Sequence, residues 1–345
     1  MAPLRRSSII VSALFFFGAI IILRMGLAPP TTTDMKTEGA KTTTARSATV
    51  AARRGVSLVD AGLPQSLQNL AIRLLGKKMA ESALNNASSL QSISCLGQQI
   101  MVTSFYADDT IERLRTEFEG GPNDLSRDTY GLSAVKSSNP LILDVGGNVG
   151  FISILAHKIH PKSQIITFEP SPLTYFFLRC NLHFNGIHVL TSEELQLPAA
   201  GVYPVFGGLG ANAGFADMSS GFDVSTKSQN GIITTSKNGN IPIYDLTKFL
   251  ERHRLYHHNL HFDIVKLDCE CCEHGLLNAH PWILERSAVK ALTGEVHGCG
   301  HLPVDQQKRT IELLRDRRGC KFPPQNFNSD GKFIYTANLN DVCPR

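Results

Sequence analysis

The sequence predicts an α/β protein with a Rossmann-like sheet that is mostly parallel and carries helices on both faces. One observation is the apolar run Leu141–Leu143, which leads into the glycine-rich stretch Asp144–Gly150. Another is a second apolar run, Ile165–Phe168, which ends at the acid Glu169. A strand, a glycine-rich turn, a helix and a second strand ending in an acid form half of a nucleotide-binding sheet.

The elements of this core are expected to alternate between strands and helices, as in a parallel sheet. Ser171 is expected to cap the second helix, with Pro172 in its first turn. The expected elements are a strand at Leu141–Val145, a helix at Phe151–Ile159, a strand at Ile165–Phe168, a helix at Leu173–Phe184 and a short third strand at Val189–Leu190.

A polar segment, Gly201–Asn240, interrupts this pattern and is expected to be an insertion that carries a hairpin near the ligand side. Its strand-like pieces are Val202–Phe206 and Gly231–Thr235. After it, Ile241–Leu246 precedes an amphipathic helix that runs through Leu250.

A second informative block places acids after a buried strand. Ile264, Val265 and Leu267 make the strand, and Asp268 and Glu270 follow it. A helix is expected at Glu273–Leu284. A further strand at Val289–Val296 then ends in Glu295 and His297. Open α/β sheets bind ligands at the carboxyl ends of their strands, so both groups are expected to face one crevice.

The glycine spacing separates two cofactor classes. A dinucleotide fingerprint reads G-x-G-x-x-G and binds a pyrophosphate, which Asp144 at the head of this loop would repel. Asp144 is expected instead to face an ammonium group, and Glu169 suits a ribose diol. S-adenosylmethionine has both groups and no phosphate. The residues expected to bind it are Asp144, Gly146, Gly147, Asn148, Gly150, Glu169 and Pro170.

These motifs together resemble the FkbM family of S-adenosylmethionine-dependent methyltransferases. The resemblance runs from about Leu141 to His297 and more loosely to Tyr335. It is carried by Asp144–Gly150, Phe168–Pro170, Asn181 with Asn185, Asp245–Leu246, Lys266 with Asp268, Glu270 and Glu273, and Glu295 with His297. It implies the sheet of a class I methyltransferase and O-methylation of a hydroxyl, often on a sugar or a secondary metabolite.

Methyl transfer to an alcohol needs an aligned acceptor and a base that removes the hydroxyl proton. The candidate catalytic residues are Asp268, His297, Glu270, Lys266 and Glu295, with His297 or Asp268 as the base and no metal expected. Two other function classes stay open. One is a catalytically inactive binding or scaffold protein, and the other is an NAD-dependent oxidoreductase.

One departure from the family pattern is Cys271, which stands where the family usually has glycine. It is expected to change the local backbone or to pair with Cys272 or Cys299. For the run Cys269-Glu270-Cys271-Cys272, packing or a disulfide is preferred over a metal site, because adjacent residues at a strand end point apart.

The N-terminus predicts a membrane anchor. Arg5 and Arg6 precede the uncharged apolar stretch Ser7–Leu23, and residues 1–28 are interpreted as a cytosolic tip and signal anchor. A cleaved secretory signal or an organellar transit peptide are the alternatives. The predicted protein is thus single-pass and type II, with a lumenal catalytic domain in the Golgi or the endoplasmic reticulum.

The rest of the chain divides into a disordered Thr- and Ala-rich stem at 29–57, a helical lead-in at 58–139 and the catalytic domain at 140–345. Within the lead-in, residues 58–96 show a helical pattern. The 34 basic and 30 acidic residues are too balanced to indicate nucleic acid as a partner. The expected partners are the membrane and a glycan or small-molecule acceptor, and the sequence predicts no oligomeric state.

Overall fold

The computed structural model describes residues 55–106, 108–218, 233–255, 260–323, 326 and 336–344, all within one compact unit. The predicted anchor at 1–28 and nearly all of the predicted stem lie outside the described residues. Among the helices of the described ranges, none combines the length and the apolar character that a membrane span requires.

The central sheet confirms the prediction of a mostly parallel Rossmann-like fold. Its strand order is β12-β11-β10-β3-β4-β5, and only β12 runs antiparallel to its neighbour. The order changes direction at β3, so ligands are expected at the carboxyl ends of β3 and β10. The strands are β3 (Leu141–Val145), β4 (Gln164–Glu169), β5 (Gly201–Phe206), β10 (Phe262–Leu267), β11 (Val289–Val296) and β12 (Ala337–Asn338).

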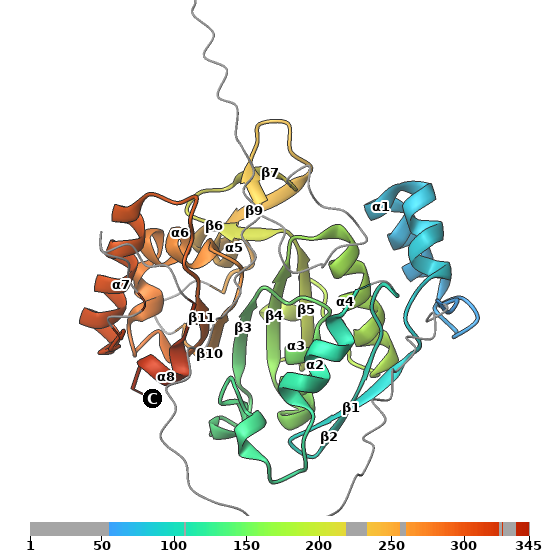
Figure 1. The fold of residues 1–345 in the computed structure, drawn as a ribbon, viewed down its shortest axis with the longest axis horizontal. Coiled ribbons are helices and arrows are strands. Elements are labelled where there is room, and N and C mark those ends of the chain that lie inside the picture. Colours follow the sequence, from blue (N-terminus) through green and yellow to red (C-terminus); the bar gives the residue numbers. More distant parts are fainter. Residues whose placement is uncertain are drawn as a thin grey trace, which may run out of the picture. The chain divides into compact units, whose positions relative to one another are not determined.

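Helices cover both faces of this sheet because its strands are apolar on both sides (Figure 1). Successive side chains alternate between the faces. Ile142 packs in the core formed with α3 and α4, whereas Leu143 packs in the core formed with α5, α6 and α7. The helices are α3 (Phe151–Ile159), α4 (Pro172–Phe184), α5 (Leu246–Arg252), α6 (Cys272–Ala279), α7 (Val304–Arg318) and the short α8 (Leu339–Val342).

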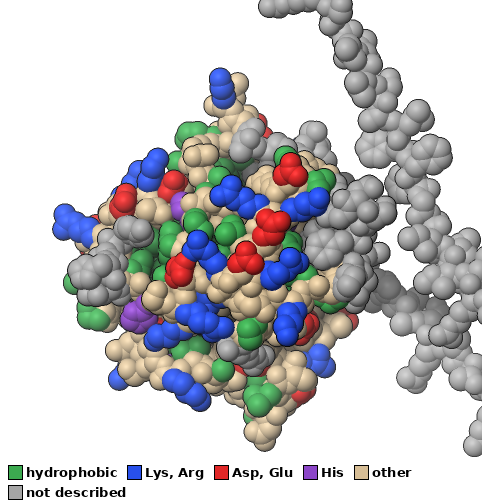
Figure 2. All heavy atoms as spheres, turned by 90° about the vertical axis from the view of Figure 1, so that its left-hand side faces the viewer, with side chains coloured by type: hydrophobic (Ala, Val, Ile, Leu, Met, Phe, Trp, Pro, Cys, Tyr) green, Lys and Arg blue, Asp and Glu red, His purple; other side chains and the backbone are tan. Residues whose placement is uncertain are grey.

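The outer surface around α7 carries charges of both signs. Figure 2 faces this side of the molecule and shows Lys and Arg side chains interspersed with Asp and Glu. Along the sequence of α7, Lys308 and Arg309 come before Glu312, and Asp316 lies between Arg315 and Arg317. The described part of α7 therefore presents no extended surface of one charge.

The third strand of the sheet differs from the prediction. Val189–Leu190 was too short to form it, and Val189 makes only one bridge to Val202. The edge strand is instead β5, which pairs with β4 over six residues. A second sheet in the order β6-β9-β7-β8 follows, made of β6 (Gly208–Gly210), β7 (Gly214–Met218), β8 (Ile233–Thr235) and β9 (Ile241–Asp245). Residues 219–232 of the predicted insertion lie outside the described residues.

The helix predicted at Glu273–Leu284 is shorter than expected. It ends at Ala279, and Pro281–Leu284 form a separate 3-10 turn. Proline has no N–H to donate and disfavours a helical conformation in the residue before it, so Pro281 ends the α-helix.

The lead-in is helical only in its first part. Helix α1 (Gln65–Asn85) matches the expectation, but an antiparallel hairpin of β1 (Gln91–Cys95) and β2 (Gln98–Val102) follows it. Ile93 and Cys95 are buried while their neighbours are more exposed, which is the alternation of a strand. Helix α2 (Thr110–Phe118) then leads back toward the central sheet.

The two asparagines four residues apart on α4 hold this hairpin against the core. Asn181 accepts a hydrogen bond from the N–H of Thr103 at 2.9 Å and donates to the carbonyl of Val149 at 2.9 Å. Asn185 accepts from the N–H of Met101 at 3.0 Å and donates to its carbonyl at 2.7 Å. Residues four apart share one helix face, which explains the spacing.

Candidate functional site

A cavity of about 390 Å³ opens at the carboxyl ends of β3, β4 and β10. Its walls come from the glycine turn after β3, the end of β4, strand β6, the loop after β10, helix α2 and the segment after β11. The predicted residues that line it are Gly146, Gly147, Asn148, Glu169, Pro170, Lys266, Asp268, Glu270 and Glu295.

The glycine turn packs directly on the loop after β10. Gly146 has a φ of +86°, and a Cβ atom there would overlap the carbonyl oxygen of Asp268. The N–H of Asp268 in turn donates to the carbonyl of Val145 at 3.1 Å. Only glycine allows this close approach, which explains the first glycine of the motif.

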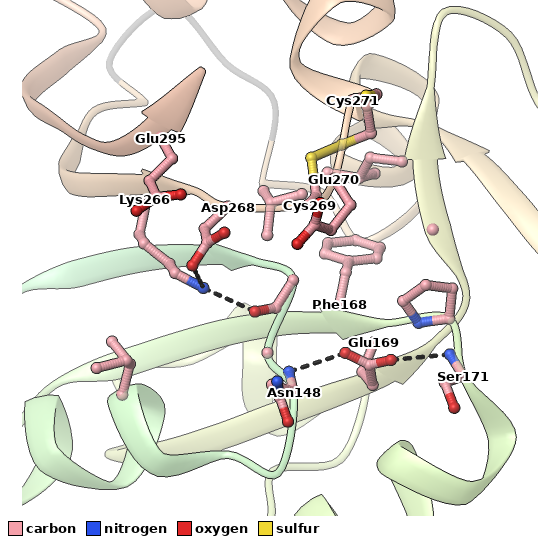
Figure 3. A pocket seen from close by; sticks show the side chains of 18 of the residues that line it. Asn148, Phe168, Glu169, Ser171, Lys266, Asp268, Cys269, Glu270, Cys271 and Glu295 are labelled. Atoms are coloured by element: carbon pink, nitrogen blue, oxygen red, sulfur yellow. Dashed lines mark hydrogen bonds and ion pairs between the residues drawn. A yellow bond between two sulfur atoms is a disulfide. The ribbon is translucent and has the colours of Figure 1, made fainter. Parts of the chain in front are cut away.

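Glu169 lies at the end of β4, where two backbone N–H groups hold its carboxylate (Figure 3). Asn148 donates to Oε2 and Ser171 donates to Oε1, each at 2.8 Å. Only 7% of the residue is exposed, and this burial raises the pKa of Glu169 to about 7, although both hydrogen bonds lower it. A carboxylate has about four acceptor positions, so the two oxygens keep capacity for a ligand diol.

Asp144, which was expected to face a ligand ammonium, does not line the cavity. Its Oδ1 lies 3.1 Å from Nζ of Lys266, and its Oδ2 accepts a hydrogen bond from Ser153 at 2.6 Å. The side chain is buried beneath the glycine turn. Gly150 and His297 are also absent from the cavity wall. Gly150 is the N-cap of α3, and a Cβ there would meet Leu178.

Lys266 connects the acids of two strands. Its Nζ donates to the carbonyl of Gly146 at 2.7 Å and lies 3.7 Å from Oδ2 of Asp268, in addition to its pair with Asp144. Burial alone would lower the pKa of Lys266, but Asp144 and Asp268 raise it above its usual value. The side chain is therefore a charged structural partner of the two acids.

The predicted acid and histidine groups do meet at the ends of β10 and β11. His297 donates from Nδ1 to Oε1 of Glu273, which is fully buried. Its Nε2 lies 3.3 Å from Glu295, 3.8 Å from Asp268 and 3.8 Å from Glu270. Burial lowers the pKa of His297, but the hydrogen bonds to Glu273 and Glu295 outweigh it and raise the pKa to about 11. His297 is thus an imidazolium at neutral pH, which leaves Asp268 as the candidate base.

Asp268, Glu295 and His297 also have one ligand atom each within 4.8 Å of one another, a spacing that suits a metal ion. The four cysteines near them are in disulfides and have no thiolate to offer.

The lead-in contributes residues that the sequence analysis missed. Tyr130 donates a hydrogen bond from its hydroxyl to Oδ2 of Asp268 at 3.0 Å, and its ring centre lies 5.6 Å from Nζ of Lys266. Arg113 and Glu117 of α2 line the same cavity. Partial desolvation at the cavity wall, with the nearby charges of Asp268 and Glu295, raises the pKa of Glu117 to about 7. In the sequence, the one indication of such a role for Tyr130 was its aromatic side chain within the mainly polar loop 123–139.

The cysteine run forms two disulfides beside the cavity. Cys269 is bonded to Cys272, and Cys271 to Cys299. Cys299 is one of the two partners that the sequence analysis left open for Cys271. A third disulfide, Cys320–Cys343, lies in the C-terminal part of the described chain.

Comparisons with known proteins give partial matches. No family model matches the sequence. Methyltransferase sdnD of Sordaria araneosa is 42% identical over 48 residues, which are 14% of this chain and 18% of that protein. Methyltransferase 1 of Beauveria bassiana (strain ARSEF 2860) is 29% identical over 56 residues, which are 16% of this chain and 22% of that protein. The chain thus matches less than a quarter of the length of either relative.

Among solved structures, the SAM-dependent methyltransferase from Agrobacterium tumefaciens matches with a TM-score of 0.33 and 14% identity, over 66% of this chain and 58% of that one. Methyltransferase FkbM from Methylobacillus flagellatus KT matches with a TM-score of 0.32 and 13% identity, over 73% of this chain and 52% of that one. TM-scores near 0.3 mean that the two structures superpose only in part. The assignment of a Rossmann-like fold therefore rests on the strand order of the sheet itself.

Proposed function

We propose that this protein is an S-adenosylmethionine-dependent O-methyltransferase. The observation that carries the proposal is Glu169, which is held at the end of β4 by the N–H groups of Asn148 and Ser171 and borders the glycine turn. A fixed carboxylate at this position suits a ribose diol. The methyltransferase names of the partial relatives support the same activity.

The charge of the cavity favours this cofactor over a dinucleotide. Five acids line it, against the two cations Arg113 and Lys266, and Lys266 is already paired with Asp144. The acids are Glu169, Asp268, Glu270, Glu295 and Glu117. These acids would repel a pyrophosphate, whereas a sulfonium and an ammonium are cations that carboxylates attract. The residues that would hold the cofactor are Gly146, Gly147, Asn148, Glu169 and Pro170, and when bound it supplies the methyl group.

The acceptor is proposed to enter beside Asp268. Tyr130 holds Oδ2 of this carboxylate, and Oδ1 faces His297. Asp268 is proposed to take the hydroxyl proton of the acceptor, while the imidazolium of His297 stabilises the surrounding acids. Glu270 and Glu295 would accept hydrogen bonds from neighbouring hydroxyls. Such a polar site suits a glycan, a glycoconjugate or a small polyhydroxylated metabolite.

A lumenal location is part of the proposal. The three disulfides of the described chain support an oxidising compartment, because disulfides are rare in reducing ones. Residues 1–28 are proposed to act as an uncleaved signal anchor, with the catalytic domain on the lumenal side.

The experiment uses the full-length chain and S-adenosylmethionine labelled on its methyl group, with a panel of oligosaccharides, glycopeptides and small polyols. The account predicts label in a product that resists mild alkali, as an ether does and an ester does not. Replacing a general base lowers the rate by about 10²- to 10⁴-fold, so Asp268→Asn should do this, while Asp316→Asn on the outer surface should not. Label that appears only on amines or esters would overturn O-methylation.

A further inference from the structure

The loop after β10 has an unusual backbone. We call Asp268–Glu273 the acid loop. Within it, Glu270 has a φ of +52° and Cys271 a φ of +87°. The backbone of an L-residue other than glycine rarely adopts this left-handed region. Two consecutive residues keep this conformation only where the surrounding structure holds them in it.

Two disulfides provide such a hold. Cys269–Cys272 closes the acid loop on itself, and Cys271–Cys299 ties it to the segment that follows β11. Cys299 is fixed in turn. It is buried, its N–H donates to Oε1 of Gln307 at 3.2 Å, and its carbonyl accepts from Nε2 of Gln307 at 2.7 Å. Since Gln307 belongs to α7, the bond anchors the acid loop to a packed helix.

The position of the acid loop determines the shape of the cavity. Its first carbonyl fills the space where a Cβ of Gly146 would lie, so the glycine turn rests on it. Its acids, Asp268 and Glu270, both face Nε2 of His297. A loop that relaxed to right-handed conformations would move the support of the glycine turn and both carboxylates together.

We propose that Cys271 and Cys299 are positioning residues, whose disulfide keeps the acid loop left-handed and thereby keeps the cavity in its ligand-binding shape. The proposal rests on the proposed function only for the choice of S-adenosylhomocysteine as a binding probe. Without the bond, the binding-competent loop would be a minor population, and the apparent affinity would fall by that fraction.

The test compares two double variants of the full-length chain that both lack the disulfide. Cys271→Ala/Cys299→Ala keeps a Cβ at the position with φ of +87°, whereas Cys271→Gly/Cys299→Ala removes it. A matched control, Cys320→Ala/Cys343→Ala, removes a disulfide whose cysteines do not line the cavity. The measurements are calorimetric binding of S-adenosylhomocysteine and hydrogen exchange of the acid-loop amides, which needs no ligand.

The alanine variant is expected to bind S-adenosylhomocysteine about tenfold more weakly, because tenfold corresponds to about 1.4 kcal/mol, the order of the penalty for a left-handed L-residue. The N–H of Asp268 should also exchange faster in it. The glycine variant should recover most of both properties, and the control should bind as the unmodified chain does. Equal behaviour of the alanine and glycine variants would overturn the proposal. If the unmodified chain binds no probe, the proposed function fails, and hydrogen exchange alone decides the role of the disulfide.

Discussion

Lys266 and Asp144 form a buried ion pair, with 3.1 Å between Nζ and Oδ1, that joins β10 to β3 beneath the glycine turn. Both side chains are nearly inaccessible to solvent. The same ammonium also binds the carbonyl of Gly146. Asp144, the acid of the glycine motif, thus supports the glycine turn through Lys266.

Lys266→Met should lower the free energy of unfolding by about 3–5 kcal/mol, because it leaves Asp144 buried without its cation. Lys266→Met/Asp144→Asn should recover part of this loss. Urea unfolding measures both. Arg317→Met, which removes an exposed pair with Glu285, is the control and should cost less than about 1 kcal/mol. A Lys266→Met chain as stable as the control would show that the pair does not hold the turn.

The affinity for S-adenosylhomocysteine should depend on pH through Glu169. The pKa of this carboxyl is raised to about 7, and only its ionised form can accept two hydrogen bonds from a diol at both oxygens. Binding should therefore tighten as pH rises through 7 and level off above it, in calorimetry between about pH 5.5 and 8.5. Glu169→Gln should bind more weakly and without this pH dependence. An affinity of the unmodified chain that stays constant over this range would contradict the assigned role.

His297 should stabilise the fold in a pH-dependent way. Its pKa in the folded protein is raised to about 11, above the ordinary value of 6.5, so the stabilisation is complete below pH 6.5 and is lost as pH rises through 11. The difference in unfolding free energy between the unmodified chain and His297→Asn should thus be largest near pH 6 and shrink toward pH 10. His183→Asn, at an exposed site, is the control. A difference that grows with pH would contradict the charged state of His297.

Gly146→Ala should disrupt the site, because its Cβ would overlap the carbonyl of Asp268 at a backbone conformation that favours glycine. The expected loss of stability is about 1–3 kcal/mol, with weaker binding of S-adenosylhomocysteine. Gly62→Ala is the matched control, because Gly62 also has a φ of +86° and a Cβ there meets no atom within 4 Å. Thermal unfolding and calorimetry would both detect the difference, and equal effects of the two substitutions would show that the close contact is unimportant.

The parts of the fold that the sequence predicted well are those with strong local patterns. The strand at Leu141–Val145 and the helix at Phe151–Ile159 have the predicted bounds, because a glycine turn separates two clear apolar runs. Val189–Leu190 failed as a strand, since two apolar residues do not specify pairing. The hairpin after α1 was missed because its alternating pattern covers only five residues a strand.

The site could be predicted only where one segment carries the chemistry. Glu169 and Asp268, which both line the cavity, could be singled out because each stands at the end of a recognisable strand. The contact of Tyr130 with Asp268 joins residues 138 positions apart, and no local pattern encodes it. The orientation of Asp144 toward Lys266 likewise depends on β3 and β10 being neighbours, which only the assembled sheet shows.

The central claim is that the cavity beside Glu169 binds S-adenosylmethionine. Calorimetric titration of the full-length chain with S-adenosylmethionine, S-adenosylhomocysteine and NAD tests it most directly. The account predicts that the first two bind at a single site, that NAD does not, and that Glu169→Ala loses the binding. A folded chain that binds neither of the first two, or that binds NAD alone, would contradict it.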